Sequence, residues 1–179
     1  MIKNKILILS FGVFAFVLLI FFYLLLSERN PTNVPSALID KKAPIFETEN
    51  LLTGEQFISS NEFGKELILV NFFASWCKQC RDEHKYIKLY ANNKNIKLIG
   101  INYKDDHDKA IAWLEKFGNP YTSIAKDKIG RIAIDWGVYG IPETFIVNKS
   151  GVIKYRHVGP INKKIYKKIN SIINKINDG

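Results

Sequence analysis

Residues 67–80 read LILVNFFASWCKQC and place the only two cysteines of the chain directly after an apolar run. Leu67 to Phe73 is rich in β-branched and aromatic residues, which predicts a buried strand. Cys80 to Asn92 contains good helix formers, so Cys77 is expected to cap a helix at a strand-to-helix turn. The positive end of that helix favours an anion, which lowers the pKa of the Cys77 thiol and raises the thiolate fraction that attacks disulfides. Cys80, one turn further on, is placed to resolve a mixed disulfide.

Other uses of the cysteine pair fit the sequence less well. A structural zinc site normally needs four ligands, and the chain adds only His84, His107 and His157, of which His84 and His157 are interpreted as structural. Covalent haem attachment requires histidine directly after the second cysteine, and Arg81 stands there. A purely structural disulfide usually closes a longer loop, whereas this spacing suits a reversible bond. We therefore expect no metal and no organic cofactor, only a redox-active Cys77–Cys80 disulfide.

The N-terminal segment is a candidate membrane anchor. Ile6 to Leu26 carries no charge and, as a helix of about 31 Å, is long enough to cross the hydrocarbon core. A cleaved signal peptide is the alternative, but its apolar core would be shorter and would end in a small-x-small site. Lys3 and Lys5 are expected to keep the N-terminus in the cytoplasm, so the rest of the chain faces outward. The predicted organisation is a cytoplasmic N-terminus (1–5), an anchor (6–26), a linker (27–41) and one domain (42–179).

The net charge of +9 raises the question of nucleic-acid binding. A cluster of lysines lies on the predicted C-terminal helix, where isoleucines recur at helical spacing from Ile161 to Ile176. The lysines then form the opposite, solvated face of an amphipathic helix. We therefore expect no nucleic-acid partner.

The pattern of the remaining elements predicts an α/β domain with a mixed sheet flanked by helices. The expected elements are two short strands around the turn at 50–55, a strand at 67–73, a helix after Cys80, a strand at 96–102, a helix at 105–117, a hairpin of strands at 144–147 and 152–156, and a final helix.

This order, with a CxxC at the first strand-to-helix turn, resembles the thioredoxin fold, and further motifs resemble the membrane-anchored CcmG/DsbE proteins of cytochrome c maturation. The matching segments are WCKQCRDEH (76–84), NYKDD (102–106), GNPY (118–121), GVYGIPETF (137–145) and YRHVG (155–159).

The resemblance implies a thiol:disulfide oxidoreductase in the bacterial inner membrane, with its catalytic domain in the periplasm. Such a protein reduces the disulfide in the haem-binding motif of apocytochrome c, or the mixed disulfide of apocytochrome c with an assembly thiol protein. A membrane electron donor of the thiol–disulfide type keeps it reduced. The alternatives are a general extracytoplasmic reductase with other targets and a module that docks apocytochrome and uses its cysteines little.

The same resemblance implies the residues that support the cysteines. Pro142 is expected in a cis peptide packed against the CxxC, where its backbone pairs with substrate. Glu83 and Glu143 are expected to disfavour the Cys77 thiolate and to relay a proton, although Glu83 could equally be a solvated residue of the first helical turn. Trp76 is expected either to shield the disulfide and contact substrate or simply to pack.

Two positions bear on how reducing the protein is. The family often has proline where Lys78 stands, and a lysine there adds positive charge beside Cys77, which favours the thiolate and a less reducing protein. General thioredoxins carry a buried aspartate in the first strand, whereas this chain has Asn71, as the family does.

Overall fold

The computed structural model describes residues 2–26, 37–64, 66–93 and 95–177. The elements, in chain order, are α1 (Ile2–Leu26), β1 (Glu47–Glu49), β2 (Gln56–Ile58), the 3-10 turn η2 (Ser59–Asn61), β3 (Leu67–Phe73), α2 (Lys78–Ala91), β4 (Ile96–Tyr103), α3 (His107–Phe117), β5 (Ser123–Asp127), α4 (Arg131–Asp135), β6 (Glu143–Val147), β7 (Ile153–Val158) and α5 (Lys163–Asn177).

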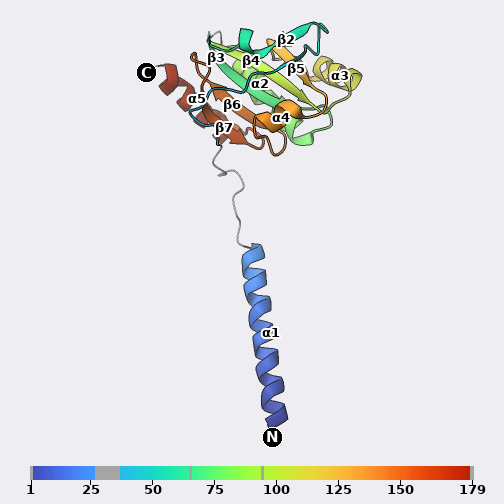
Figure 1. The fold of residues 1–179 in the computed structure, drawn as a ribbon, viewed down its shortest axis with the longest axis vertical. Helices are drawn as coiled ribbons and strands as arrows, with labels where there is room; N and C mark the ends of the chain where they lie inside the picture. Colours follow the sequence, from blue (N-terminus) through green and yellow to red (C-terminus); the bar gives the residue numbers. More distant parts are fainter. Residues whose placement is uncertain (1, 27–36, 65, 94, 178–179) are drawn as a thin grey trace. The chain divides into compact units, whose positions relative to one another are not determined.

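The centre of the domain is a five-stranded mixed sheet in the order β5-β4-β3-β6-β7 (Figure 1). β3 runs parallel to β4 and antiparallel to β6, and every one of its seven residues is buried. Strands buried on both faces read as continuous apolar runs, which explains the composition of LILVNFF. β3 is the middle strand, so the loop after its C-terminal end lies near the centre of that end of the sheet. The cysteine pair follows this loop.

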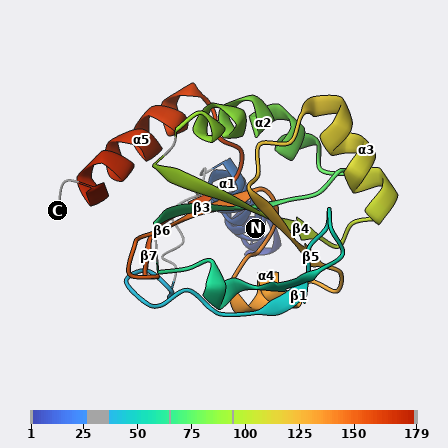
Figure 2. The same ribbon diagram turned by 90° about the horizontal axis from the view of Figure 1, so that it is seen from above.

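Helices cover both faces of this sheet (Figure 2). Leu67, Leu69 and Phe73 of β3 pack into a cluster with α2, α3 and α5, while Ile68, Val70 and Phe72 pack into a second cluster on the other face with α4 and Phe57 of β2. The period-two alternation of a strand thus divides one apolar run between two cores. Asn71 falls on the α2 side, below the helix that begins at the cysteines.

Besides the short turn η2, one strand and one α-helix of the described residues were absent from the sequence prediction. β5 is an edge strand of five residues with Lys126 near its end, and α4 is a single short turn of helix. Neither contains enough periodic residues to be recognised alone. The buried Asp127 holds α4 in place, because its carboxylate accepts hydrogen bonds from the N–H groups of Ile132 and Ala133.

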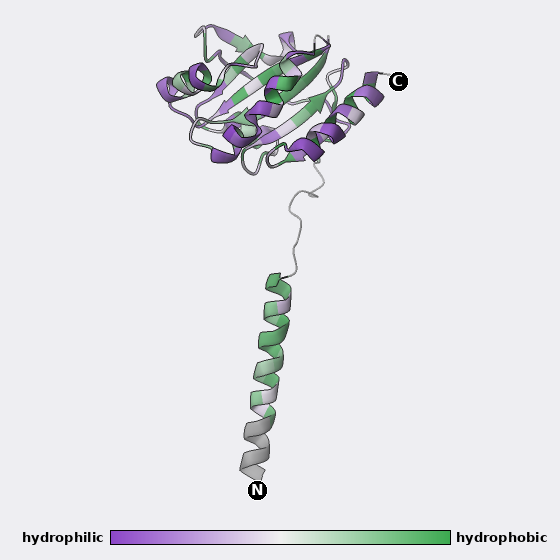
Figure 3. Cartoon of the chain, turned by 180° about the vertical axis from the view of Figure 1, so that it is seen from behind, coloured by the Kyte–Doolittle hydropathy of each residue, from purple (hydrophilic) through white to green (hydrophobic). Residues whose placement is uncertain are grey.

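The N-terminal helix and the domain form separate compact units. Within α1, the stretch Leu9–Leu26 is long and apolar enough to cross a membrane, a test that a signal sequence would also pass (Figure 3). Most of the predicted linker, 27–36, lies outside the described residues. Residues 37–40 form a turn in which the Asp40 N–H donates to the Ile153 carbonyl at 2.8 Å, so the domain begins a few residues before the predicted boundary at 42.

Candidate functional site

Cys77 and Cys80 form a disulfide at the start of α2. Cys77 is the N-cap residue of the helix, and its Sγ accepts a 3.0 Å hydrogen bond from the Cys80 N–H. One free N–H of the first helical turn thus points at the Cys77 sulfur, and Cys77 caps the helix as the sequence predicts. A thiolate on Cys77 would receive the same bond, strengthened by its charge.

The loop that contains Pro142 packs against Cys77. The Ile141–Pro142 peptide is cis, as the family resemblance implies, and the Ile141 carbonyl oxygen lies 3.8 Å from the Cys77 Sγ. The loop therefore presents backbone groups beside the reactive sulfur, where an extended substrate segment can pair with them.

Glu143 follows Pro142 and is completely buried. Its Oε2 accepts a 2.7 Å hydrogen bond from Nε of Arg156, which is also buried, and its Oε1 accepts one from the Tyr139 N–H. Arg156 also donates to the Gly137 carbonyl. Because these bonds tie 137–143 to β7, Glu143 fixes the shape of the cis-proline loop. Both carboxylate oxygens of Glu143 thus accept hydrogen bonds from Arg156 and Tyr139, and the proton relay expected for this residue stays a prediction.

Glu83 lies on the buried face of α2. The helix buries the stripe Cys80, Glu83, His84, Ile87 and Tyr90. Glu83 is only 1% exposed, which excludes the solvated alternative. Its Oε1 accepts from Asn71 Nδ2 at 2.9 Å and its Oε2 from the Ile161 N–H at 2.8 Å. Burial raises the pKa of Glu83 to about 7, against the opposing effect of these two hydrogen bonds. Near neutral pH, a proton acceptor and donor thus lies one helical turn from Cys80.

Asn71 is held by a buried network that the sequence did not reveal. The Tyr121 hydroxyl donates a 2.7 Å bond to Asn71 Oδ1, which turns the amide nitrogen toward Glu83 and Thr144. Burial raises the pKa of Tyr121 well above 10, so the hydroxyl remains a donor. Gly100 makes room for Tyr121, since a Cβ there would lie 3.0 Å from the ring. In the sequence, Tyr121 stood out only as part of the motif GNPY (118–121), to which no function was assigned.

Asp105 is a second residue whose position the sequence did not explain. Its carboxylate accepts hydrogen bonds from the N–H and hydroxyl of Ser75 and from Asn102 Nδ2. The Trp76 indole donates to the Lys104 carbonyl at 3.1 Å while its side chain stays 59% exposed. The end of β4 thus anchors the loop before Cys77 and leaves Trp76 accessible beside the disulfide. Because β3 and β4 are parallel, their carboxyl ends meet at one edge, which is the signal that could have suggested this contact.

The two buried histidines contact backbone carbonyls. His84 Nε2 lies 2.8 Å from the Gly118 oxygen, and His157 Nε2 lies 3.4 Å from that of Pro160. Burial lowers the pKa of both imidazoles. Within the described residues no group of three potential metal ligands comes together. The structural role expected of His84 and His157 stays a prediction.

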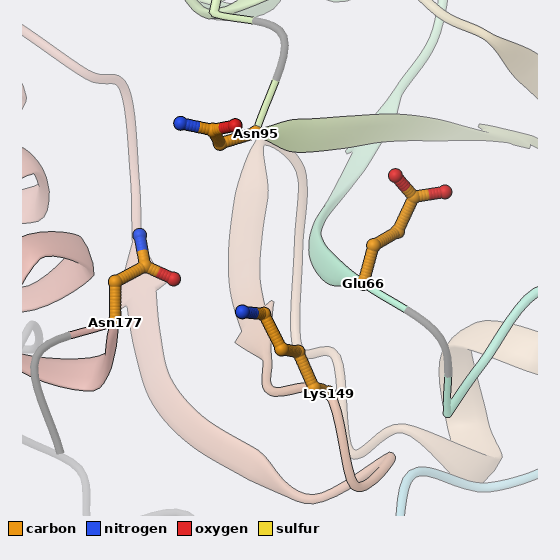
Figure 4. Close-up of a pocket in the computed structure, with 4 residues that line it drawn as sticks. All are labelled: Glu66, Asn95, Lys149 and Asn177. Carbon is orange, nitrogen blue, oxygen red and sulfur yellow. The ribbon is translucent and has the colours of Figure 1, made fainter.

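A cavity of about 410 Å³ lies away from the cysteine pair. It is lined by Glu66, Asn95, Lys149 and Asn177 (Figure 4). Glu66 precedes β3 and Asn95 precedes β4, whereas Cys77 follows the far end of β3. The seven residues of β3, about 23 Å long, separate the end of the sheet that holds this cavity from the end that holds the cysteines. A second groove, of equal size, adjoins Trp76 and is considered below.

Comparison with known proteins places the chain in a family. The Redoxin family model matches residues 39–173. The thiol:disulfide interchange protein DsbE of Escherichia coli is 43% identical over 139 residues, covering 76% of this chain and 74% of that protein. DsbE of Allochromatium vinosum is 38% identical over 159 residues, covering 89% and 87% of the two chains.

A solved structure of similar fold is that of a putative DsbE from Chlorobium tepidum. It superposes with a TM-score of 0.67 at 24% identity, covering 75% of this chain and 94% of that one. The thioredoxin-like arrangement expected from the sequence is therefore confirmed. The chain belongs to the DsbE family of thiol:disulfide interchange proteins, and it is a thiol–disulfide oxidoreductase.

Proposed function

We propose that this protein is a periplasmic reductase, anchored in the bacterial inner membrane by α1, that reduces the disulfide in the haem-binding motif of apocytochrome c during cytochrome c maturation. Its substrate is either that disulfide or the mixed disulfide of apocytochrome c with an assembly thiol protein. The observation that carries the chemistry is the placement of Cys77 Sγ, which accepts the Cys80 N–H and lies 3.8 Å from the Ile141 carbonyl oxygen. The choice of substrate and the reducing direction come from the resemblance of the motifs to the cytochrome c maturation family.

In the proposed reaction the reduced protein attacks first through Cys77. Its thiolate forms a bond to one sulfur of the substrate disulfide, and the other substrate sulfur leaves as a thiolate that takes a proton from solvent. The Cys80 thiol then loses its proton to Glu83, whose pKa of about 7 suits it as the acceptor. The Cys80 thiolate attacks the Cys77 sulfur, and the second substrate sulfur leaves as a thiolate that takes a proton from solvent. Two electrons have moved to the substrate, and the Cys77–Cys80 disulfide remains.

The catalytic pair carries out this chemistry without an organic cofactor, so the disulfide must be reduced again after each turnover. A membrane donor of the thiol–disulfide type would return two electrons and two protons to the pair. Pro142, Glu143 and Trp76 act in this scheme as supporting residues. Glu143 fixes the cis-proline loop through Arg156, and the exposed Trp76 is placed to contact substrate.

The test compares a disulfide-bonded peptide that contains a haem-binding motif with an unrelated disulfide peptide of equal length. Full-length reduced protein is expected to reduce the haem-motif peptide faster, and Cys77→Ser is expected to abolish both reactions. Equal rates for the two peptides would favour a general extracytoplasmic reductase. If Cys77→Ser still restores cytochrome c in cells that lack this protein, the protein is a docking module and the proposed reductase is wrong.

A further inference from the structure

A groove of about 410 Å³ lies between α3 and the residues that flank the cysteine pair at the start of α2. Its lining includes Trp76, Arg81, Lys109, Trp113, Lys116 and Phe117. Trp76 directly precedes Cys77, and Arg81 directly follows Cys80. A ligand that touches Trp76 or Arg81 in this groove therefore contacts a residue that is bonded directly to one of the two cysteines.

The groove is positively charged. Three of its lining residues are the cations Arg81, Lys109 and Lys116, all exposed, and none of its lining residues is acidic. No ion pair found in the described part of the chain uses any of these three side chains. The Asp105 carboxylate, which contacts Ser75 of the groove lining, already accepts hydrogen bonds from Ser75 and Asn102. The positive charge therefore remains available to a ligand.

The groove also offers aromatic surface. Trp113 is 7% exposed and packs against Phe117 with ring centroids 5.5 Å apart. Trp76, at the other side, is largely exposed. A carboxylate flanked by apolar or aromatic groups would complement cations and aromatic faces at once.

We propose that this groove binds an acidic segment of the substrate polypeptide next to the cysteine that reacts with Cys77. The inference rests on the proposed function, because it assigns the groove to the substrate of the same site. Exposed ion pairs are individually weak, but once the mixed disulfide forms the segment is tethered, and its effective concentration at the groove is high. Before that step, the three cations attract an acidic segment electrostatically and accelerate its encounter with Cys77.

The experiment uses the full chain, reduced, in nanodiscs of phosphatidylcholine. Two disulfide peptides of one length are compared, with two glutamates or two glutamines beside the reacting cysteine. Uncharged hydroxyethyl disulfide measures the intrinsic reactivity of the cysteines. The groove variant Lys109→Gln/Lys116→Gln removes two exposed charges from α3 and leaves the residues next to the cysteines unchanged. It is matched by Lys164→Gln/Lys167→Gln, which removes two exposed charges from α5.

Wild-type protein is expected to reduce the glutamate peptide about tenfold faster than the glutamine peptide at low salt, and this preference should shrink at about 0.3 M salt. The groove variant should reduce the preference to less than about twofold while keeping its rate on hydroxyethyl disulfide, and the α5 variant should keep the preference.

Three results would overturn the inference. One is equal rates for the two peptides in wild type, and another is a preference that survives in the groove variant. The third is a preference that disappears when anionic phosphatidylglycerol enters the nanodisc, because a lipid headgroup would then be the occupant. Each of these leaves the reductase activity intact, whereas a protein that reduces neither peptide contradicts the proposed function and the inference together.

Discussion

Asn71 donates a 2.9 Å hydrogen bond to Glu83 in the core of the domain, and this bond joins the central strand to the helix that begins at the cysteines. Glu83 is a buried acid with no cationic partner among its hydrogen-bond donors, which are Asn71 and the Ile161 N–H. Burial favours the neutral acid, and the two donors favour the carboxylate. The balance leaves a pKa of about 7, so this group can exchange a proton under physiological conditions.

The raised pKa of Glu83 predicts a pH dependence of stability. Between about pH 4.5 and about pH 7 the folded protein keeps a proton that the unfolded chain releases, so the free energy of unfolding falls as pH rises through this window. The contribution is at most about 3 kcal/mol. In Glu83→Gln this fall should be absent, whereas the exposed control Glu115→Gln should retain it. Urea unfolding at pH 5 and pH 8 measures the difference, and equal pH slopes in wild type and Glu83→Gln would contradict the assignment.

Glu83 should also control the second chemical step. When Cys80 attacks the mixed disulfide it must lose a proton, and Glu83 is the buried acceptor nearest to it along α2. Glu83→Gln should slow release of the reduced product about a hundredfold and should leave formation of the mixed disulfide much less affected. In wild type the rate of release should rise through a pKa of about 7. Stopped-flow kinetics with quenched samples separates the two steps. A variant that slows both equally would assign Glu83 a purely structural role.

Tyr121 should contribute to stability through the Asn71 network. Tyr121→Phe keeps the ring, which stacks on Phe73 at 4.8 Å, but leaves Asn71 Oδ1 without its donor. The expected loss is about 1–3 kcal/mol, because a buried acceptor becomes unsatisfied. Tyr90→Phe is the control, since its hydroxyl makes only a 3.3 Å bond to a carbonyl. Equal losses of unfolding free energy in the two variants would show that the hydroxyl of Tyr121 has no special role.

Glu143 and Arg156 should behave as a coupled buried pair. Glu143→Gln leaves the Arg156 guanidinium, 4% exposed, without its counter-charge and should cost about 3–5 kcal/mol. Arg131→Gln, which breaks the exposed pair with Asp135, should change stability by less than about 0.5 kcal/mol. Chemical unfolding provides the comparison. The titration of Cys77 in Glu143→Gln tests the expectation that Glu143 disfavours the Cys77 thiolate, and an unchanged Cys77 pKa would contradict that expectation.

The sequence predicted those parts of the fold that have strong local signals. β3 was recognisable because it is apolar throughout, and Cys77 as a cap because a strand precedes it and helix formers follow. β5 and α4 were missed because they are short and depend on tertiary contacts, such as the Asp127 carboxylate on the N–H groups of α4.

The candidate site shows the same division. The cysteines and Pro142 could be placed by their motifs, and so could the presence of acids at 83 and 143. Whether each acid is neutral, paired or exposed depends on what the fold packs around it. Glu83 accepts hydrogen bonds from two uncharged donors, whereas Glu143 forms an ion pair with Arg156. No local sequence pattern distinguishes these two environments. Tyr121 and Asp105 act at distances of 50 and 30 residues from their partners, beyond any local signal.

The most direct test of the central claim is a Cys80→Ser trap, expressed as the full chain in its native membrane. Without the resolving thiol, Cys77 should remain joined to its substrate, and mass spectrometry can identify the partner of the isolated adduct. The account predicts apocytochrome c or a cytochrome c assembly thiol protein as the main adduct, and none with Cys77→Ser. A broad set of unrelated exported proteins, or no adduct at all, would contradict it.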